Sequence, residues 1–178
     1  MAEEQCFYRN DDEWNAIAER LKQVACPHCK SVGTLNRHGH LYGFDESSPP
    51  RKTLRARRLF CSNRIRRRSC GRTFSVWLAD KIQRLSLTTS TLWKFLQHAV
   101  ASSIAAATRS VDCHLSDRTL QRIWRRFDLG QSKIRTTLLG LRPPPELPSQ
   151  WPAAQVLAHL QAIFSNADCP IAKFQLTL

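Results

Sequence analysis

Four cysteines, arranged in two pairs, have the residue type and spacing of a metal site. Cys26 and Cys29 form a C-x-x-C pair, and Cys61 and Cys70 form a second, looser pair. Zn²⁺ prefers four soft ligands in a tetrahedron, and a structural zinc site is closed by protein ligands alone. The short turn inside the first pair brings both sulfurs to one ion, so the second pair must come from a distant segment. We therefore predict one structural Zn²⁺ bound by Cys26, Cys29, Cys61 and Cys70.

Three histidines are alternative ligands. His28 lies inside the first cysteine pair, where its side chain is expected to point away from the metal, and His38 and His40 flank Gly39 on an expected hairpin. Seven cysteines make an odd number, and the N-terminus lacks the layout of a secretory signal, which argues against a disulfide framework. The isolated cysteines are expected to be small buried hydrophobic residues; they are Cys6, Cys113 and Cys169.

The composition indicates a polyanionic partner. The 178-residue chain carries a formal net charge of +13 and has a pI of about 10.1. Between Lys30 and Arg84 only Asp45, Glu46 and Asp80 oppose a long series of basic residues. Nucleic acid is the leading candidate and a membrane surface the second, although no run of about 20 apolar residues exists to span a bilayer.

The segment between Cys61 and Cys70 contains four arginines that are too dense to pack inward. Like charges held together repel each other unless an anion compensates them. A solvated loop is the plainer interpretation, but we favour contact with phosphate or with the minor groove. These arginines are Arg64, Arg66, Arg67 and Arg68.

Residues 87–127 are expected to be helical, and their last helix has the design of a DNA-reading helix. Ser116 is a plausible N-cap, and Leu120, Ile123, Trp124 and Phe127 form the buried face. A helix-turn-helix lays its second helix in the major groove, where Arg pairs with guanine and Gln with adenine. The alternative is a solvated basic face on an ordinary bundle helix. The predicted base-reading residues are Arg118, Gln121 and Arg122, and the predicted phosphate contacts are Arg125 and Arg126.

The expected fold class is α+β, with a small β-rich zinc ribbon followed by helices. Short apolar pieces between Gly and Pro predict short strands, with a hairpin tip near residues 45–52. The predicted regions are an N-terminal amphipathic helix (1–23, helical over 11–23), the zinc ribbon (24–80), the helix-turn-helix (86–130), a Pro-rich linker (131–152), and a C-terminal helix with a strand-like tail (153–178).

Several motifs together resemble the N-terminal zinc ribbon of bacterial insertion-sequence transposases. They are Cys26-Pro27-His28-Cys29, Asn36-Arg37-His38-Gly39, Arg58-Leu59-Phe60-Cys61 and Cys70-Gly71-Arg72-Thr73-Phe74. The nearest comparison is the DNA-binding subunit of the IS1-type elements, in which the ribbon is followed by a helix-turn-helix. The resemblance covers residues 24–127. The chain departs from the family pattern in the long spacing between Cys61 and Cys70 and in its C-terminal third.

The sequence favours a binding protein over an enzyme. A transposase core needs three carboxylates for two metal ions, whereas only Asp128, Glu146 and Asp168 follow the helical region. Both tyrosines lie outside that region, and the adjacent Cys113 and His114 cannot face each other as a nucleophile and a base.

We therefore expect a sequence-specific duplex-DNA-binding protein that is cytoplasmic and associated with the nucleoid. It would serve as an accessory or regulatory subunit for a separately encoded transposase or recombinase. The sequence leaves open whether the protein is a homodimer. The alternatives are a transcription regulator unrelated to transposition and an RNA-binding zinc-ribbon protein. Scarcity of exposed aromatic residues for base stacking counts against RNA, although Trp77 and Trp93 are available.

Overall fold

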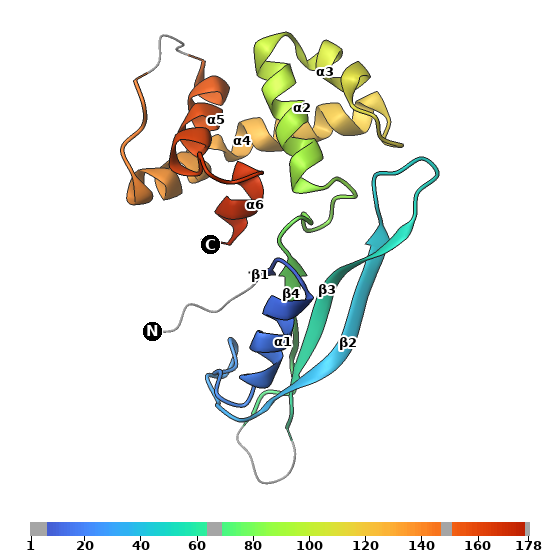
Figure 1. The fold of residues 1–178 in the computed structure, drawn as a ribbon, viewed down its shortest axis with the longest axis vertical. Helices are drawn as coiled ribbons and strands as arrows, with labels where there is room; N and C mark the ends of the chain where they lie inside the picture. Colours follow the sequence, from blue (N-terminus) through green and yellow to red (C-terminus); the bar gives the residue numbers. More distant parts are fainter. Residues whose placement is uncertain (1–6, 64–68, 147–150, 177–178) are drawn as a thin grey trace.

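The chain folds into a four-stranded sheet and a group of helices, as the computed structural model shows for residues 7–63, 69–146 and 151–176 (Figure 1). The predicted α+β class is confirmed. The arginines predicted to contact phosphate between Cys61 and Cys70, which are Arg64, Arg66, Arg67 and Arg68, lie outside these described residues.

The sheet has the strand order β1-β4-β3-β2. Strands β2, β3 and β4 pair antiparallel, whereas the short β1 pairs parallel to β4. The predicted hairpin tip is confirmed between β2 and β3, but the strands beside it are ten residues long, and the prediction of short strands is wrong for them. The strands are β1 (Phe7–Tyr8), β2 (Leu35–Phe44), β3 (Lys52–Cys61) and β4 (Thr73–Leu78).

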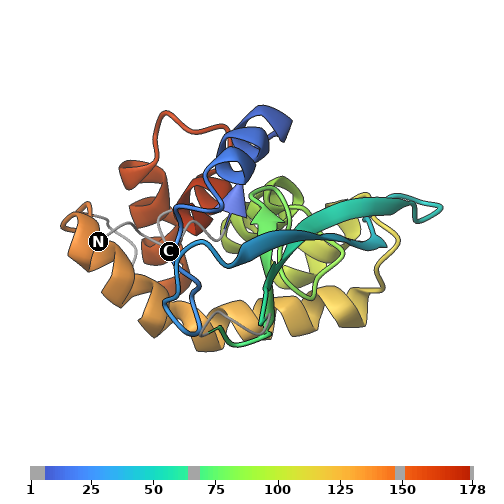
Figure 2. The same ribbon diagram turned by 90° about the horizontal axis from the view of Figure 1, so that it is seen from below.

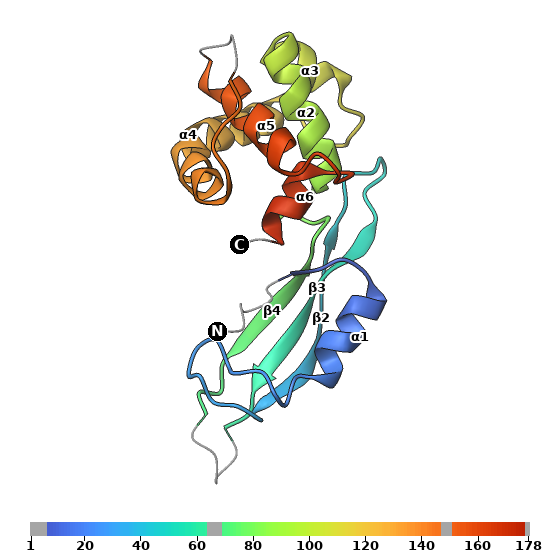
Figure 3. The same ribbon diagram turned by 60° about the vertical axis from the view of Figure 1, so that its left-hand side comes forward.

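Helix α1 (Asp11–Glu19) covers one face of this sheet (Figure 3). It ends four residues before the predicted Gln23, and the Asn10 side chain caps its start by accepting from the N–H of Glu13. Its apolar side, with Trp14 and Ile17, packs on Tyr8 and on inward residues of β3 and β4. The resulting core is small; its buried members are Tyr8, Trp14, Ile17, Leu21, Cys26, Leu35, Leu59, Cys61 and Val76.

The remaining helices form a second, larger core. Thr88 and Ser103 cap α2 and α3 with their side chains, which fixes where these two helices begin. Buried aromatic and aliphatic residues from α2, α4 and α5 meet in this core, among them Phe95, Leu120 and Val156. The helices are α2 (Thr89–Ala101), α3 (Ile104–Ser110), α4 (Asp117–Leu141), α5 (Pro152–Ile163) and α6 (Pro170–Gln175).

Helix α4 continues far beyond the predicted end of the helical region. The predicted boundary at residue 130 and the first half of the predicted linker 131–152 are therefore wrong, because α4 runs to Leu141. Buried Gln131 and Leu138, with half-buried Ile134, continue the apolar spacing of Trp124. Two glycines and several polar residues interrupt this pattern in the sequence and conceal it.

The C-terminal tail is helical, so the strand-like tail predicted after residue 171 is wrong. Pro170 occupies the first position of α6, where its missing N–H has no intrahelical partner to lose. Pro170 is buried, and Ile171 and Phe174 pack against the larger core. The side-chain amide of Gln175 donates to the carbonyls of Ala79 and Lys81 at 2.9 and 3.2 Å, which joins α6 to the end of β4.

The hairpin tip joins the sheet to the helices. The Glu46 carboxylate accepts the N–H of Thr88 at 2.6 Å and the hydroxyls of Thr88 and Thr91 at 2.9 and 2.6 Å. Arg55, only 6% exposed, donates to the carbonyls of Phe44, Ile82 and Leu85. These contacts connect β2 and β3 to the segment that leads into α2. We name this group of contacts the joint.

Replacing Glu46 by alanine should lower the free energy of unfolding by about 2–3 kcal/mol. The change removes three hydrogen bonds to a carboxylate, and it also removes a negative charge from the N-terminus of α2. Chemical denaturation measures the effect. The control is Glu146→Ala, which removes an exposed carboxylate. Equal stability of the two variants would contradict the role given to Glu46.

Candidate metal centre and basic helix

The four predicted cysteines lie together. Their sulfurs are all within 4.8 Å of one another, and Cys26 and Cys61 are buried while Cys29 and Cys70 are half-buried. The Sγ atoms of Cys26 and Cys70 are 3.8 Å apart, and those of Cys29 and Cys61 are 3.7 Å apart. A disulfide would require about 2.05 Å. The cluster therefore consists of four free thiols around one point, where they can hold a metal ion.

Two turns bring these cysteines together. In the first, the N–H of Lys30 donates to the Cys26 carbonyl at 2.8 Å, and Lys30 itself adopts a positive φ of 61°. The N–H of Cys26 donates to the Ser31 carbonyl at 2.9 Å, which closes the turn. In the second, Cys61 ends β3, and its N–H donates to the Arg72 carbonyl at 2.9 Å. The long Cys61–Cys70 spacing is thus compatible with a shared site, because its two ends are hydrogen-bonded.

The local environment divides the thiols by acidity. Burial raises the pKa of Cys26 to about 11. Hydrogen bonds with Ser31, mainly with its side chain and also with its backbone, lower the pKa of Cys29 to about 6. Burial acts to raise the pKa of Cys61, but hydrogen bonds, first with Thr34 at 3.3 Å, outweigh it and lower this pKa. The thiolate is the form that binds metals, so an ion held by all four cysteines would keep all four deprotonated.

The alternative histidine ligands are outside the cluster. The rings of His28 and Phe74 form a T-shaped pair with their centroids 6.2 Å apart, and the ring centroids of His38 and Phe60 are 5.5 Å apart. His40 is 3.3 Å from an Arg57 nitrogen. Among the described residues, the group able to hold a metal contains these four cysteines and no histidine.

The predicted DNA-reading residues all lie on the exposed side of α4. Leu120, Ile123 and Trp124 of the same helix are buried, so the predicted division into an apolar and a basic face is present. The side chains on the exposed side are Arg118, Gln121, Arg122, Arg125 and Arg126.

The basic face of α4 continues past its predicted end. Lys133 is exposed and lies on the same line as Arg118, Arg122, Arg125 and Arg126, because residues turn by about 100° each along a helix. We name these five residues the basic stripe; it is about 22 Å long at 1.5 Å per residue. None of them forms an ion pair with an acidic side chain in the described parts of the chain. The stripe is an uncompensated cationic line.

Neither acidic residue of α4 interrupts this line. Asp117 and Asp128 lie about 100° or more around the helix from the middle of the stripe. Asp128 accepts from the Gln131 side chain at 2.8 Å. Leu129, which is 83% exposed, lies in the middle of the stripe.

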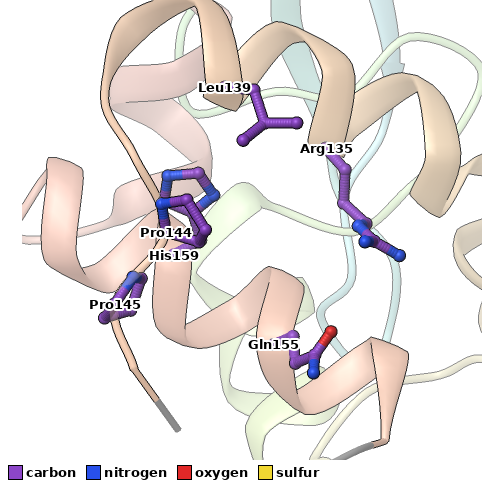
Figure 4. Close-up of a pocket in the computed structure, with 6 residues that line it drawn as sticks. All are labelled: Arg135, Leu139, Pro144, Pro145, Gln155 and His159. Carbon is purple, nitrogen blue, oxygen red and sulfur yellow. The ribbon is translucent and has the colours of Figure 1, made fainter.

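A separate cavity of about 150 Å³ lies between α4, the segment after it and α5 (Figure 4). His159, which is buried, contacts the Arg142 carbonyl through Nε2 at 2.9 Å. Among the described residues that line the cavity, none offers a carboxylate or thiol beside this imidazole. The lining residues are Arg135, Leu139, Pro144, Pro145, Gln155 and His159.

None of the helices in the described residues is long and apolar enough to cross a membrane. The chain matches no protein-family model, no curated protein and no solved structure.

Proposed function

We propose that this chain is a zinc-dependent duplex-DNA-binding protein without catalytic activity of its own. One Zn²⁺, held by Cys26, Cys29, Cys61 and Cys70, would stabilise the sheet. The basic stripe on α4 would contact the DNA. The observation that carries the proposal is the combination, on the same chain, of a four-thiol cluster with a cationic stripe that has no acidic partner among the described residues.

The sulfur geometry supports zinc as the metal. Four thiolates about 2.3 Å from a central Zn²⁺ lie about 3.8 Å from one another at the corners of a tetrahedron. The two separations given above, 3.8 Å for Cys26–Cys70 and 3.7 Å for Cys29–Cys61, agree with this value. Four sulfur ligands leave no position for water or substrate, which fits a structural role.

The shape and charge of α4 support duplex DNA as the partner. The major groove is wide enough for an α-helix, and side chains near the helix start reach the base edges. Arg118, Gln121 and Arg122 occupy that start and are exposed. The short α3 precedes α4 and packs against it, as the first helix of a helix-turn-helix would. Arg125, Arg126 and Lys133 would then meet phosphates.

The resemblance to insertion-sequence transposases supports the finer proposal that the protein assists a separately encoded transposase or recombinase. A transcription regulator would use the same zinc site and the same helix. RNA is less well supported, because α4 presents cations on a rigid helix and no exposed aromatic side chain for base stacking.

Competition binding tests the proposed partner. The zinc-loaded chain is titrated with a labelled duplex selected from a random pool, and unlabelled duplex, single-stranded DNA or RNA then compete. We expect the selected duplex to compete best and a scrambled duplex more weakly. Stronger competition by RNA would replace the proposal with the RNA-binding alternative.

Elemental analysis tests the metal. We expect one zinc per chain in purified protein, and the same content in variants with Cys113→Ser or Cys169→Ser, because neither thiol belongs to the cluster. Cys29→Ser should reduce the zinc content. A zinc content of zero in folded protein would contradict the proposed cofactor.

A further inference from the structure

The two sides of the sheet differ in charge. Helix α1 covers one side and carries four acidic residues, Asp11, Asp12, Glu13 and Glu19. Asp11 pairs with Arg57 and Glu13 with Arg9, whereas the exposed Asp12 and Glu19 have no cationic partner among the described residues. The other side of β3 and β4 carries Arg58, Phe60, Thr73 and Ser75, which are paired across the two strands. The ribbon shows α1 on the opposite side of these strands (Figures 1 and 3). We name these four residues the uncovered face.

Two neighbouring arginines of β3 identify the side of the sheet that faces α1 and the side that faces away from it. The Arg57 guanidinium lies 5.8 Å from the Tyr8 ring and 5.2 Å from the Trp14 ring, and it pairs with Asp11 of α1. Successive residues of a strand point to opposite faces, so Arg58 points away from α1. Its Nη2 donates to the Thr73 hydroxyl at 3.2 Å. Arg58 has no acidic partner among the described residues.

Helix α4 lies on the same side of the sheet as the uncovered face. Seen from below, α1 and α4 are on opposite sides of the strands (Figure 2). The view turned about the vertical axis agrees, with α1 on the right and α4 at the upper left (Figure 3). The basic stripe is on the side of α4 that does not pack against the larger core.

The joint holds these two surfaces together. Glu46 and Arg55 fix the hairpin to residues 82–91, which lead into α2 and form its start, through five hydrogen bonds. A sixth, from Arg55 to the Phe44 carbonyl, lies within the hairpin. A rigid connection allows the second contact of a bound ligand to form without a further loss of translational freedom. The stripe and the uncovered face can therefore act on one ligand.

We propose that a bound duplex lies along this side of the molecule and contacts the uncovered face as well as the basic stripe. This inference rests on the proposed DNA binding. Arg58 would contact the phosphate backbone outside the segment read by α4. The unpaired Asp12 and Glu19 of α1 would repel a polyanion, which favours an orientation with the sheet between α1 and the DNA. The occupant is a duplex, because the basic stripe is proposed to bind one and the phosphate backbone of a duplex continues beyond the segment that α4 contacts.

The test compares the same charge change on the two sides. Arg58→Gln should weaken duplex binding about tenfold and reduce the slope of log K against log salt by about 1. Arg20→Gln is the matched control, because Arg20 is exposed at the end of α1. It should change affinity less than twofold. Unchanged zinc content and thermal unfolding show that each variant is folded.

Crosslinking gives a second readout. A benzophenone side chain at Ser75, on the uncovered face, should crosslink to the duplex, and one at Asn15, exposed on α1, should not. If both positions behave alike, and Arg58→Gln behaves like Arg20→Gln while α4 variants lose binding, this inference is overturned and the proposed function stands. If the zinc-loaded wild type binds no duplex, or if Ser75 crosslinks to RNA in preference, both are overturned.

Discussion

Removing the metal should unfold the sheet while the helices stay folded. The smaller core contains nine buried residues, and two of these are the cluster members Cys26 and Cys61. Structural zinc contributes about 10–16 kcal/mol of binding free energy in small zinc domains, which exceeds what so small a core supplies. The larger core has fifteen buried residues and contains none of the four cysteines. We therefore expect the two parts to respond differently to chelation.

Amide hydrogen exchange measures this difference strand by strand. In the full chain, chelation or Cys61→Ser should abolish the protection of β3 and β4 and leave α2 and α4 protected, with a loss of no more than about 100-fold, the equivalent of the Glu46 contacts. Cys113→Ser is the matched control, because it removes a thiol that packs beside the larger core. Protection of β3 that is the same with and without metal would show that the cluster is not a stabilising metal site.

Neutralising the four arginines of the basic stripe should have the largest effect on DNA binding. Replacing Arg118, Arg122, Arg125 and Arg126 by Gln together should weaken binding about 10³-fold. It should also reduce the magnitude of the slope of log K against log salt by about 3–4, because the DNA releases about one counterion fewer for each arginine that no longer neutralises a phosphate. All four are exposed and lack acidic partners among the described residues, so the fold should tolerate the change. Titration against a duplex at several salt concentrations measures both quantities.

A charge-preserving control separates affinity from base recognition. The same four positions changed to Lys should keep the salt slope but lose preference for the selected duplex, because lysine lacks the planar fork that pairs with guanine. Arg122→Ala alone should cost about 1–3 kcal/mol on the preferred site and relax the preference at one base pair. If the glutamine variant binds as tightly as the wild type, α4 is not the DNA contact.

Local patterns in the sequence were sufficient for the cysteine cluster and for the two faces of α4. The Cys26–Cys29 spacing predicts a shared ion directly, and the remaining pair follows because Cys61 and Cys70 were the nearest cysteines left to complete four ligands. The apolar spacing of Leu120, Ile123 and Trp124 predicts which side of the helix is buried, and the structure confirms it.

Features that depend on contacts distant in sequence could not be predicted in this way. The joint depends on a contact between Glu46 and Thr88, which is 42 residues later in the chain, and no local sequence pattern predicts such a contact. Strand β1 is two residues long and exists only because β4 pairs with it. Helix α6 resembles a strand in its alternation, and its helical form depends on packing against the larger core.

Which of Arg57 and Arg58 faces α1 was also beyond the sequence. Both arginines belong to one run of basic residues, and their pattern of charge is the same. The position of α1, which covers one side of the sheet only, determines that Arg57 pairs with Asp11 while Arg58 does not. The sequence therefore indicated how much basic charge this strand carries. How that charge is distributed between the two sides of the sheet could be seen only in the folded structure.

The most direct test of the central claim is the salt dependence of duplex binding by the zinc-loaded chain, measured alongside the same chain after chelation. If about six to eight phosphates are neutralised, log K should fall against log salt with a slope of about −5 to −7, and chelation should weaken binding and flatten the slope. A slope near zero, or a slope and affinity unchanged by removal of the metal, would contradict the account of a zinc-dependent DNA-binding protein.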